Sequence, residues 1–148
     1  PQPFNVDEAV RDTVESFAEL AQAKDCSLDI SSLPELIFCG DEAAVRQLVS
    51  ILLDNAVKYA VPDTVIHVSL EPLRRGVQLA VENDYVQPID VPLDRLFDRF
   101  YRPDASRTAA TGGFGIGLSI AKSIAEAHHG TICASTKENR ITFTAELK

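Results

Sequence analysis

Apolar residues recur at the three- and four-residue spacing of an amphipathic helix in three segments of the chain. The first segment spans Asn5–Lys24 and the second spans Asp41–Ala60. The third begins near Ile116, continues through Ile120 and ends near His129. We therefore expect three helices, each with one face turned toward a hydrophobic core.

Residues at the ends of these segments predict where the helices begin and end. Asn5 and Glu8 resemble a capping box, in which each residue bonds a free backbone N–H group of the first turn. Asp41 is a favourable N-cap for the second helix because its carboxylate accepts from the same kind of group. Gly130 suits the C′ position of the third helix, where the backbone commonly turns left-handed.

Between the helices lie segments that are typical of strands, several with clear two-residue alternation. Arg74, Arg75 and Gly76 separate two of them and predict an antiparallel hairpin. The strand candidates are Leu28–Ile30, Leu36–Cys39, Val65–Leu70, Val77–Val81, Thr131–Thr136 and Arg140–Leu147. Three helices and five or six strands predict an α+β fold, a two-layer α/β sandwich with helices on one face of a mixed sheet.

The stretch between the second hairpin strand and the third helix has a different character. Leu93–Tyr101 predicts a short helix, whereas residues 102–113 are polar and rich in turn residues and are a candidate for a mobile lid. Gly112–Ile120 then places four glycines in six residues directly before the third helix. Glycine lets the backbone approach a phosphate closely, and the N–H groups of a helix N-terminus favour an anion.

Composition limits the class of protein further. The chain has 148 residues, 45% hydrophobic and 24% charged, which is ordinary for one globular domain over residues 1–148. Its net charge of −8 argues against a general nucleic-acid surface or an anionic-membrane surface. No apolar run approaches the roughly 20 residues of a membrane span. Because the chain lacks methionine and starts at Pro1, we expect it to be part of a longer protein.

The second predicted helix carries a polar edge beside its apolar stripe. Asn55, Lys58 and Tyr59 lie near Ile51 at helical spacing. An amide at such an edge must find partners or cost stability. On this helix alone, a core asparagine bonded to backbone or water is the simpler interpretation. Together with the downstream glycine-rich loop, the edge becomes a candidate site for a phosphate ligand.

Three motifs in this order resemble those of one family. Residues 52–60, LLDNAVKYA, resemble the N box of sensor histidine kinases. Residues 96–102, LFDRFYR, resemble their F box, and residues 112–130, GGFGIGLSIAKSIAEAHHG, resemble their second glycine box and its helix. Over nearly its whole length the chain resembles the catalytic, ATP-binding domain of a sensor histidine kinase, which has the Bergerat ATP-binding fold.

This resemblance implies a domain that binds Mg-ATP and transfers its γ-phosphate to a histidine of a separate dimerisation domain of the same protein. A response regulator would be a further partner. The domain would lie in the cytoplasm as part of a membrane-bound receptor, without touching the membrane itself. Asn55 would ligate the magnesium ion, Lys58 would contact a phosphate, and Tyr59 would flank the ribose or base.

The resemblance also assigns the residues around the phosphates. The second glycine box would supply backbone donors and adjoining contacts from Gly113, Gly115, Ile116, Gly117 and Leu118. Three arginines at or near the lid could neutralise phosphate charge, and one or two of them would suffice: Arg99, Arg102 and Arg107.

One motif of the family is altered. Its first glycine box reads D-x-G-x-G, whereas the corresponding residues here, Asn83–Ile89, contain no glycine. Asn83 stands in place of the aspartate that accepts from the adenine amino group, and an amide can make the same bond. If the alignment with the family motif shifts by one residue, Asp84 would instead be the residue that contacts the adenine amino group. The missing glycines favour an alternative function, a pseudokinase module that docks a partner without catalysis.

Two other absences bear on the reaction. Gyrase-like members carry a glutamate four residues before the metal-binding asparagine, and Ile51 stands there in this chain, which argues against a dedicated ATPase. His67, His128 and His129 are expected to be structural, so the phosphate acceptor would lie outside this chain. A protein-serine kinase of the anti-sigma type is a third possibility, against which the LFDRFYR motif speaks.

Overall fold

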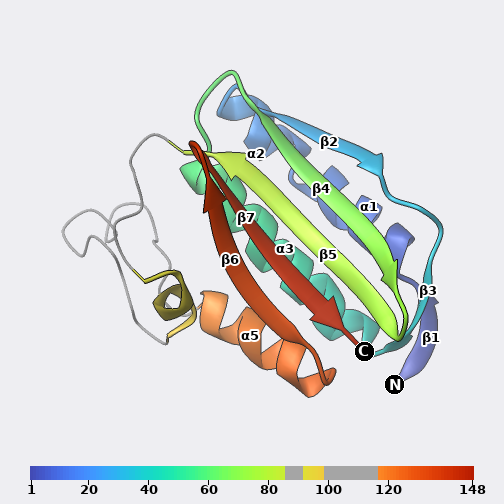
Figure 1. Cartoon of the computed structure of the whole chain (residues 1–148). Helices are drawn as coiled ribbons and strands as arrows, with labels where there is room; N and C mark the ends of the chain where they lie inside the picture. The colour runs from blue at the N-terminus through green and yellow to red at the C-terminus, as the bar shows by residue number, and fades with distance from the viewer. Residues whose placement is uncertain (86–91, 99–116) are drawn as a thin grey trace.

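The computed structural model describes residues 1–85, 92–98 and 117–148. Figure 1 shows a twisted sheet with helices on one of its faces. None of the helices in these ranges is long and apolar enough to cross a membrane. The helices are α1 (Val6–Ser16), α2 (Ala18–Ala23), α3 (Glu42–Tyr59) and α5 (Gly117–Ala127).

Five strands form the main sheet in the order β2-β4-β5-β7-β6. β2 runs parallel to β4, and the other neighbours are antiparallel, so the sheet is mixed. The predicted α+β class and the mixed sheet with its single helical layer are confirmed (Figure 1). The strands are β2 (Ser27–Ser32), β4 (Val65–Leu73), β5 (Gly76–Asp84), β6 (Thr131–Lys137) and β7 (Arg140–Leu147).

The alternation of β5 extends further than the sequence predicted. Val77, Leu79 and Val81 are buried, and Asn83 continues the same series at 1% exposure. Because side chains of a strand alternate between its faces, Asn83 lies on the face that the helices cover. The strand was predicted to end at Val81, and instead it carries a polar side chain into the core.

A second, two-stranded sheet lies at the N-terminal end of the chain. β1 (Gln2–Asn5) pairs antiparallel with β3 (Ile37–Gly40). The strand predicted at Leu36–Cys39 is therefore present, but it belongs to this small sheet. β1 was not predicted, because its four residues show no alternation and its pairing partner lies more than thirty residues away in the sequence.

The first predicted helix is two helices, α1 and α2, that meet at Phe17. The N–H group of Phe17 bonds the carbonyl oxygen of Val14, a tighter turn than the α-helix makes. The predicted capping box is wrong, because the Asn5 side chain caps nothing. The buried Asp7 carboxylate instead accepts from the N–H group of Leu36 at 3.1 Å, which ties the first turn of α1 to the segment before β3.

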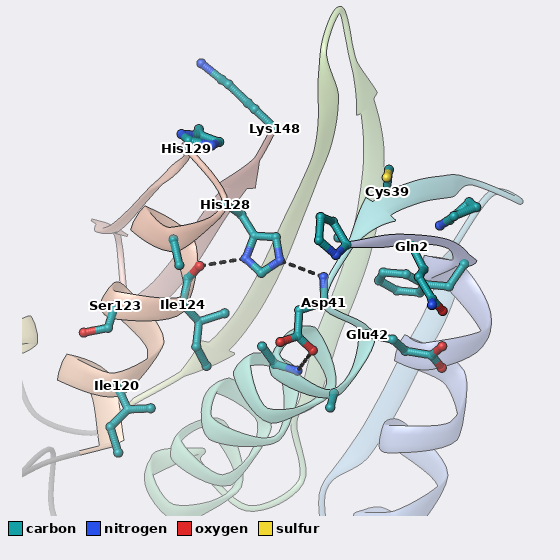
Figure 2. Close-up of a pocket in the computed structure, with 17 residues that line it drawn as sticks. Gln2, Cys39, Asp41, Glu42, Ile120, Ser123, Ile124, His128, His129 and Lys148 are labelled. Atoms are coloured by element: carbon teal, nitrogen blue, oxygen red, sulfur yellow. Dashed lines mark hydrogen bonds between the residues drawn. The ribbon is translucent and has the colours of Figure 1, made fainter.

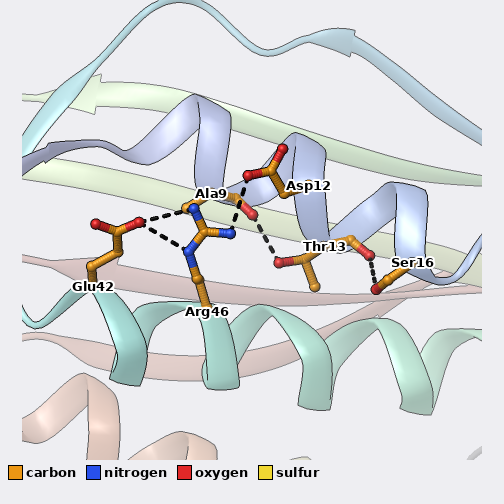
Figure 3. Close-up of polar contacts among 6 residues, drawn as sticks. All are labelled: Ala9, Asp12, Thr13, Ser16, Glu42 and Arg46. Carbon is orange, nitrogen blue, oxygen red and sulfur yellow. Dashed lines mark hydrogen bonds and ion pairs between the residues drawn. The ribbon is translucent and has the colours of Figure 1, made fainter.

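α3 begins where the sequence predicts, because the Asp41 carboxylate accepts from the Ala44 N–H group at 3.1 Å. Figure 3 shows how α3 is joined to α1. The Arg46 guanidinium lies 2.8 Å from Glu42 and 3.2 Å from Asp12. Its hydrogen bond to Glu42, and then that to Asp12, raises the already high pKa of Arg46. These pairs are exposed, so they contribute at most about 1 kcal/mol each.

The short helix predicted at Leu93–Tyr101 is a 3-10 helix, η1 (Leu93–Phe97). Leu96 and Phe97 are buried, and the Phe97 ring packs edge-on against Phe143 of β7 with centroids 6.0 Å apart. Residues 99–101 and the predicted lid at residues 102–113 lie outside the described residues.

The C-terminal end of α5 differs from the prediction. His129, at φ +58°, occupies the left-handed C′ position, and its N–H group bonds Glu126. Gly130 follows, and its N–H group bonds Ala125, which completes a Schellman motif. Gly130 is required for space, because a Cβ there would lie 1.6 Å from the carbonyl oxygen of Glu146. The prediction that Gly130 occupies the C′ position is therefore wrong by one residue, because His129 is C′ and Gly130 is C″.

We predict that His129→Gly raises the free energy of unfolding by about 0.5–1 kcal/mol, because a left-handed backbone strains a residue with a Cβ. Gly130→Ala is the matched contrast. It should cost about 2 kcal/mol or more, since the added atom overlaps the backbone of β7. Urea unfolding of both variants checks this, and equal effects at the two positions would contradict the assignment.

On the sheet face opposite the helices, Asp29 of β2 pairs with His67 of β4 at 2.9 Å. The pKa of Asp29 is lowered, mainly because the backbone N–H group of Ser31 donates to its carboxylate. The Ser31 hydroxyl and His67 add to this effect. Folding therefore favours the ionised form of Asp29.

We predict that Asp29→Asn lowers stability at neutral pH and that the difference from the parent shrinks on acidification. The contribution is present above the ordinary pKa of 3.8 and is lost as pH falls through the lower value of the folded state. Urea unfolding at a series of pH values measures it. A stability difference that stays constant down to strongly acidic pH would contradict the assignment.

Candidate functional site

The last two turns of α3 carry the polar edge that the sequence singled out. Asn55 is 7% exposed, although it is an amide, and its side chain makes no hydrogen bond within the described ranges. Ile51, one turn earlier, is partly buried and packs on the core. Lys58 and Tyr59 complete this end of the helix, Lys58 exposed and Tyr59 half-buried. The helix thus offers a buried amide next to a solvent-facing cation.

The N-terminus of α5 lies against the same part of α3. A Cβ on Gly117, the first residue of α5, would stand 3.6 Å from Cγ2 of Ile51. Ile51 and Asn55 are separated by one helical turn, so the free N–H groups of the α5 N-terminus open close to Asn55. Such groups attract an anion. Leu118 follows with its side chain in the core at 1% exposure, so only its backbone can face a ligand.

The end of β5 is the third part of the candidate site, after the end of α3 and the start of α5. The Asp84 carbonyl oxygen accepts from the Val61 N–H group at 3.2 Å, which fastens the end of β5 to the residues just after α3. Asn83 donates from Nδ2 to the same carbonyl oxygen at 2.8 Å. Its own carbonyl oxygen is buried and has no partner in the part of the chain that the structure describes. A lone buried acceptor of this kind costs stability.

The structure separates Asn83 from the alternative residue Asp84. Asp84 lies on the opposite face of β5, and its carboxylate accepts from Arg140 at 3.2 Å. Asn83 faces the helices with an oxygen available for a donor. The two residues are adjacent in sequence, and only Asn83 lies on the side where α3 ends.

The charges beside Asn55 are arranged within one helix. Lys58 lies 3.0 Å from the Asp54 carboxylate, a partly exposed i,i+4 pair. Asp54 is thus directed away from the buried Asn55 side, as the 100° step between consecutive helix residues predicts. Lys58 is held close to the site by a weak surface pair that a phosphate could replace.

These groups fit a nucleotide with its metal. A buried amide oxygen is a suitable ligand for magnesium, an unpartnered buried carbonyl suits an amino group of a base, and helix N–H groups suit phosphate oxygens. The remaining predicted site residues lie outside the described residues: Arg99, Arg102, Arg107, Gly113, Gly115 and Ile116. The bond between Val61 and Asp84, which brings β5 to α3, had no signal in the sequence.

Comparison with known proteins defines the class. Residues 40–148 match the family model described as "Histidine kinase-, DNA gyrase B-, and HSP90-like ATPase". Because the match covers more than half of the chain, the protein belongs to this ATPase family. The matched residues contain all of α3, β5 and α5, the three elements that form the candidate site.

Within the family, the relatives reported by name are sensor histidine kinases and sensor proteins. The chain is 36% identical to sensor histidine kinase CusS of Escherichia coli O157:H7 over 144 residues, 97% of this chain and 30% of that protein. It is 39% identical over 113 residues to the probable sensor protein PcoS of Escherichia coli, 76% of this chain and 24% of that protein. These matches confirm the resemblance to sensor histidine kinases, of which the chain spans less than a third.

Solved structures agree on the fold. The catalytic domain of histidine kinase ThkA has a TM-score of 0.82 to this chain at 23% identity, covering 99% of this chain and 93% of that domain. At this identity the likeness concerns the fold alone. It confirms the predicted ATP-binding fold of this family.

We predict that Asn83→Val raises the free energy of unfolding by about 1 kcal/mol, because it removes a buried oxygen without a partner in the described ranges and valine suits a strand. The Asp84 carbonyl oxygen keeps the bond from Val61, so no new unpaired group arises. Asn83→Asp is the contrast and should destabilise, because it buries a charge. Urea unfolding in the absence of nucleotide measures the stability of both variants. A valine variant less stable than the parent would show that Asn83 is a structural residue.

Proposed function

We propose that residues 1–148 form one catalytic domain that binds Mg-ATP and transfers its γ-phosphate to a histidine of a separate dimerisation domain of the same protein. The observation that carries this proposal is the buried carbonyl oxygen of Asn83, which has no partner among the described residues and lies beside the polar end of α3. A core residue that costs stability in the absence of a ligand points to a ligand. The kinase names of the relatives support the reaction.

In this proposal the Asn55 carbonyl oxygen would hold the magnesium ion, which would supply positive charge to the phosphates. Asn55 suits this role because it is held rigidly in α3 and is nearly buried. Lys58 exchanges its Asp54 partner for a phosphate, and Tyr59 flanks the ribose or base. The free N–H groups at the start of α5, with Gly117, hold the polyphosphate.

Asn83 reads the adenine. Its unpartnered oxygen accepts from the adenine amino group, while Nδ2 is already engaged with the Asp84 carbonyl oxygen. That internal bond fixes the orientation of the amide, so the oxygen and not the NH2 group is presented to the base. A guanine base, with an acceptor where adenine has its donor, would be rejected.

The site favours transfer to a protein over hydrolysis. Ile51 stands one turn before Asn55 and abuts Gly117, where a water-activating carboxylate would have to lie. The nearest carboxylate of the same helix turn, Asp54, is paired with Lys58. Water at the phosphates therefore lacks a general base from the described part of α3.

The proposal extends to residues outside the described ranges and to partners. Backbone groups of Gly113, Gly115 and Ile116, and one or two of Arg99, Arg102 and Arg107, would complete the phosphate site. In the whole protein, which we propose is a membrane-bound receptor with this domain in the cytoplasm, a response regulator takes the phosphate from the histidine. The names of the sensor kinase relatives support this setting.

A second candidate function is a pseudokinase module that docks a partner without phosphate transfer. It is favoured by the absence of glycine from Asn83–Ile89, which limits how closely the backbone can approach a base. Magnesium-dependent ATP binding followed by transfer would exclude it. Binding to a helical histidine domain without transfer would favour it.

We predict that Asn55→Ala lowers magnesium-dependent affinity for ATP about 10- to 100-fold and abolishes phosphate transfer to a helical, histidine-bearing domain of a sensor kinase. The fold should survive, because the side chain makes no bond within the described ranges. Asp54→Asn, at the neighbouring and partly exposed position, is the matched control and retains both activities. Transfer of labelled phosphate from ATP and calorimetric titration measure the two effects. An Asn55→Ala variant that binds as well as the parent would refute the magnesium site.

We predict further that Asn83→Asp keeps or improves ATP affinity, although it destabilises the free domain, whereas Asn83→Val loses about 10-fold or more. The reason is that aspartate retains the acceptor for the adenine amino group and valine does not. Calorimetric titration with ATP and GTP measures both affinities and the base preference. A large loss in the aspartate variant would show that another residue reads the base.

A further inference from the structure

The buried imidazole of His128 joins the C-terminal end of α5 to the N-terminus of α3 (Figure 2). Its Nδ1 lies 2.8 Å from the carbonyl oxygen of Ile124, and its Nε2 accepts from the N–H group of Asp41 at 3.1 Å. Because a carbonyl only accepts and a backbone amide only donates, Nδ1 must carry the proton and Nε2 must be bare. Both bonds together require the neutral ring in this one tautomer.

This link lies at the opposite end of the helix pair from the candidate nucleotide site. α3 and α5 run antiparallel, with Gly117 beside Ile51 at one end and His128 bonded to Asp41 at the other. At a rise of 1.5 Å per residue, the stretch between the two contacts is about 15 Å in α3 and about 16 Å in α5. The two helical stretches have nearly the same length. The contact between His128 and Asp41 therefore determines where Gly117 lies along α3.

One further directional bond holds this end of α5: the Lys148 N–H group, just after β7, donates to the His128 carbonyl oxygen at 2.9 Å. The contacts along the helix itself are less specific. Its four buried residues are all apolar and at most 8% exposed: Leu118, Ala121, Ile124 and Ala125. Apolar contacts resist separation of the helix from the core but have little directional preference. The hydrogen bond from Asp41 is directional, so it opposes sliding of α5 along its axis.

The His128 ring occupies a space, referred to below as the slot, that Gly40 and Phe38 shape closely around it. A Cβ on Gly40 would lie 2.9 Å from Cδ2 of His128 and 2.5 Å from the Phe38 ring, so only glycine leaves room for the imidazole. The Phe38 ring lies 5.8 Å from that of His128 between centroids. The position of the imidazole is therefore determined by β3 as well as by the two helices.

The slot opens to a cavity of about 850 Å³, which gives the imidazole access to solvent protons. Besides His128, the ionisable side chains that line this cavity are Cys39 of β3, Asp41 and Glu42 at the start of α3, and His129 and Lys148 beside the end of α5 (Figure 2). A proton on Nε2 would point at the Asp41 N–H group and at the positive end of the α3 dipole. Protonation thus breaks the link to α3 and leaves the bond to Ile124 intact.

We propose that His128 is a positioning residue for nucleotide binding. Its bare Nε2 holds α5 at the axial position that places the Gly117 end beside Asn55, and protonation of His128 releases this hold and weakens nucleotide binding. The proposal rests on the proposed function, because its readout at the far end is affinity for Mg-ATP.

Two variants of the full chain separate the link from the internal bond of α5. In His128→Gln, the longer amide can place its oxygen near the position of Nε2 and accept from Asp41, and it does not titrate. In His128→Asn, the shorter amide can donate to Ile124 but cannot reach Asp41. We expect the glutamine variant to bind a non-hydrolysable ATP analogue within about two-fold of the parent, and the asparagine variant to bind about five-fold more weakly.

The pH profile provides a readout that a merely structural role would not move. Affinity of the parent for the analogue should fall about five-fold more between about pH 8 and about pH 5 than that of His128→Gln, which controls for titration of the nucleotide. Nitrogen NMR of His128 should show protonated Nδ1 and bare Nε2 at the higher pH. Exchange of the Asp41 amide proton, relative to its intrinsic rate at each pH, should be faster at the lower pH, where the hydrogen bond to Nε2 is absent.

The outcomes are distinguishable. Equal affinities of the glutamine and asparagine variants, equal pH profiles of parent and glutamine variant, or a proton on Nε2 in the neutral ring would each overturn the positioning role while leaving nucleotide binding in place. Absence of nucleotide binding by the parent at every pH would overturn the proposed function and the coupling with it.

Discussion

The packing of α3 beside α5 on one face of the sheet is the constraint on which the rest of the molecule depends. Leu48 and Leu52 of α3 and Leu118 of α5 are at most 1% exposed, and burial of such apolar surface supplies most of the stabilisation of the fold. The same packing brings the buried amide of Asn55 toward the free N–H groups where α5 begins. The packing of α3 against α5 therefore both stabilises the domain and brings the parts of its candidate site together.

The candidate site is also where the molecule departs from the rules that make a stable core. Asn83 occupies a position that Val77, Leu79 and Val81 lead one to expect is apolar, and its oxygen has no partner among the described residues. Asn55 is nearly buried on the edge of an apolar stripe. Proteins commonly give up stability at functional positions, and here both departures lie where β5 and α3 meet.

Local rules predicted the elements but not the contacts between distant ones. The alternation of β4 and β5 and the Asp41 cap depend on neighbouring residues, so the sequence predicted them. The end of α5 depends on the clearance between Gly130 and Glu146 of another strand, so His129 was not recognised as the C′ residue. For the site, periodicity suggested a polar edge, the family resemblance named its residues, and only the fold placed Asn83 on the helix-covered face.

The most direct test of the account is a calorimetric titration of this chain with a non-hydrolysable ATP analogue, with and without magnesium. The account predicts saturable binding at micromolar analogue that depends on magnesium, since Asn55 is proposed to hold the ion. Absence of binding up to millimolar analogue, both for the chain alone and with a helical histidine-bearing domain attached, would contradict it.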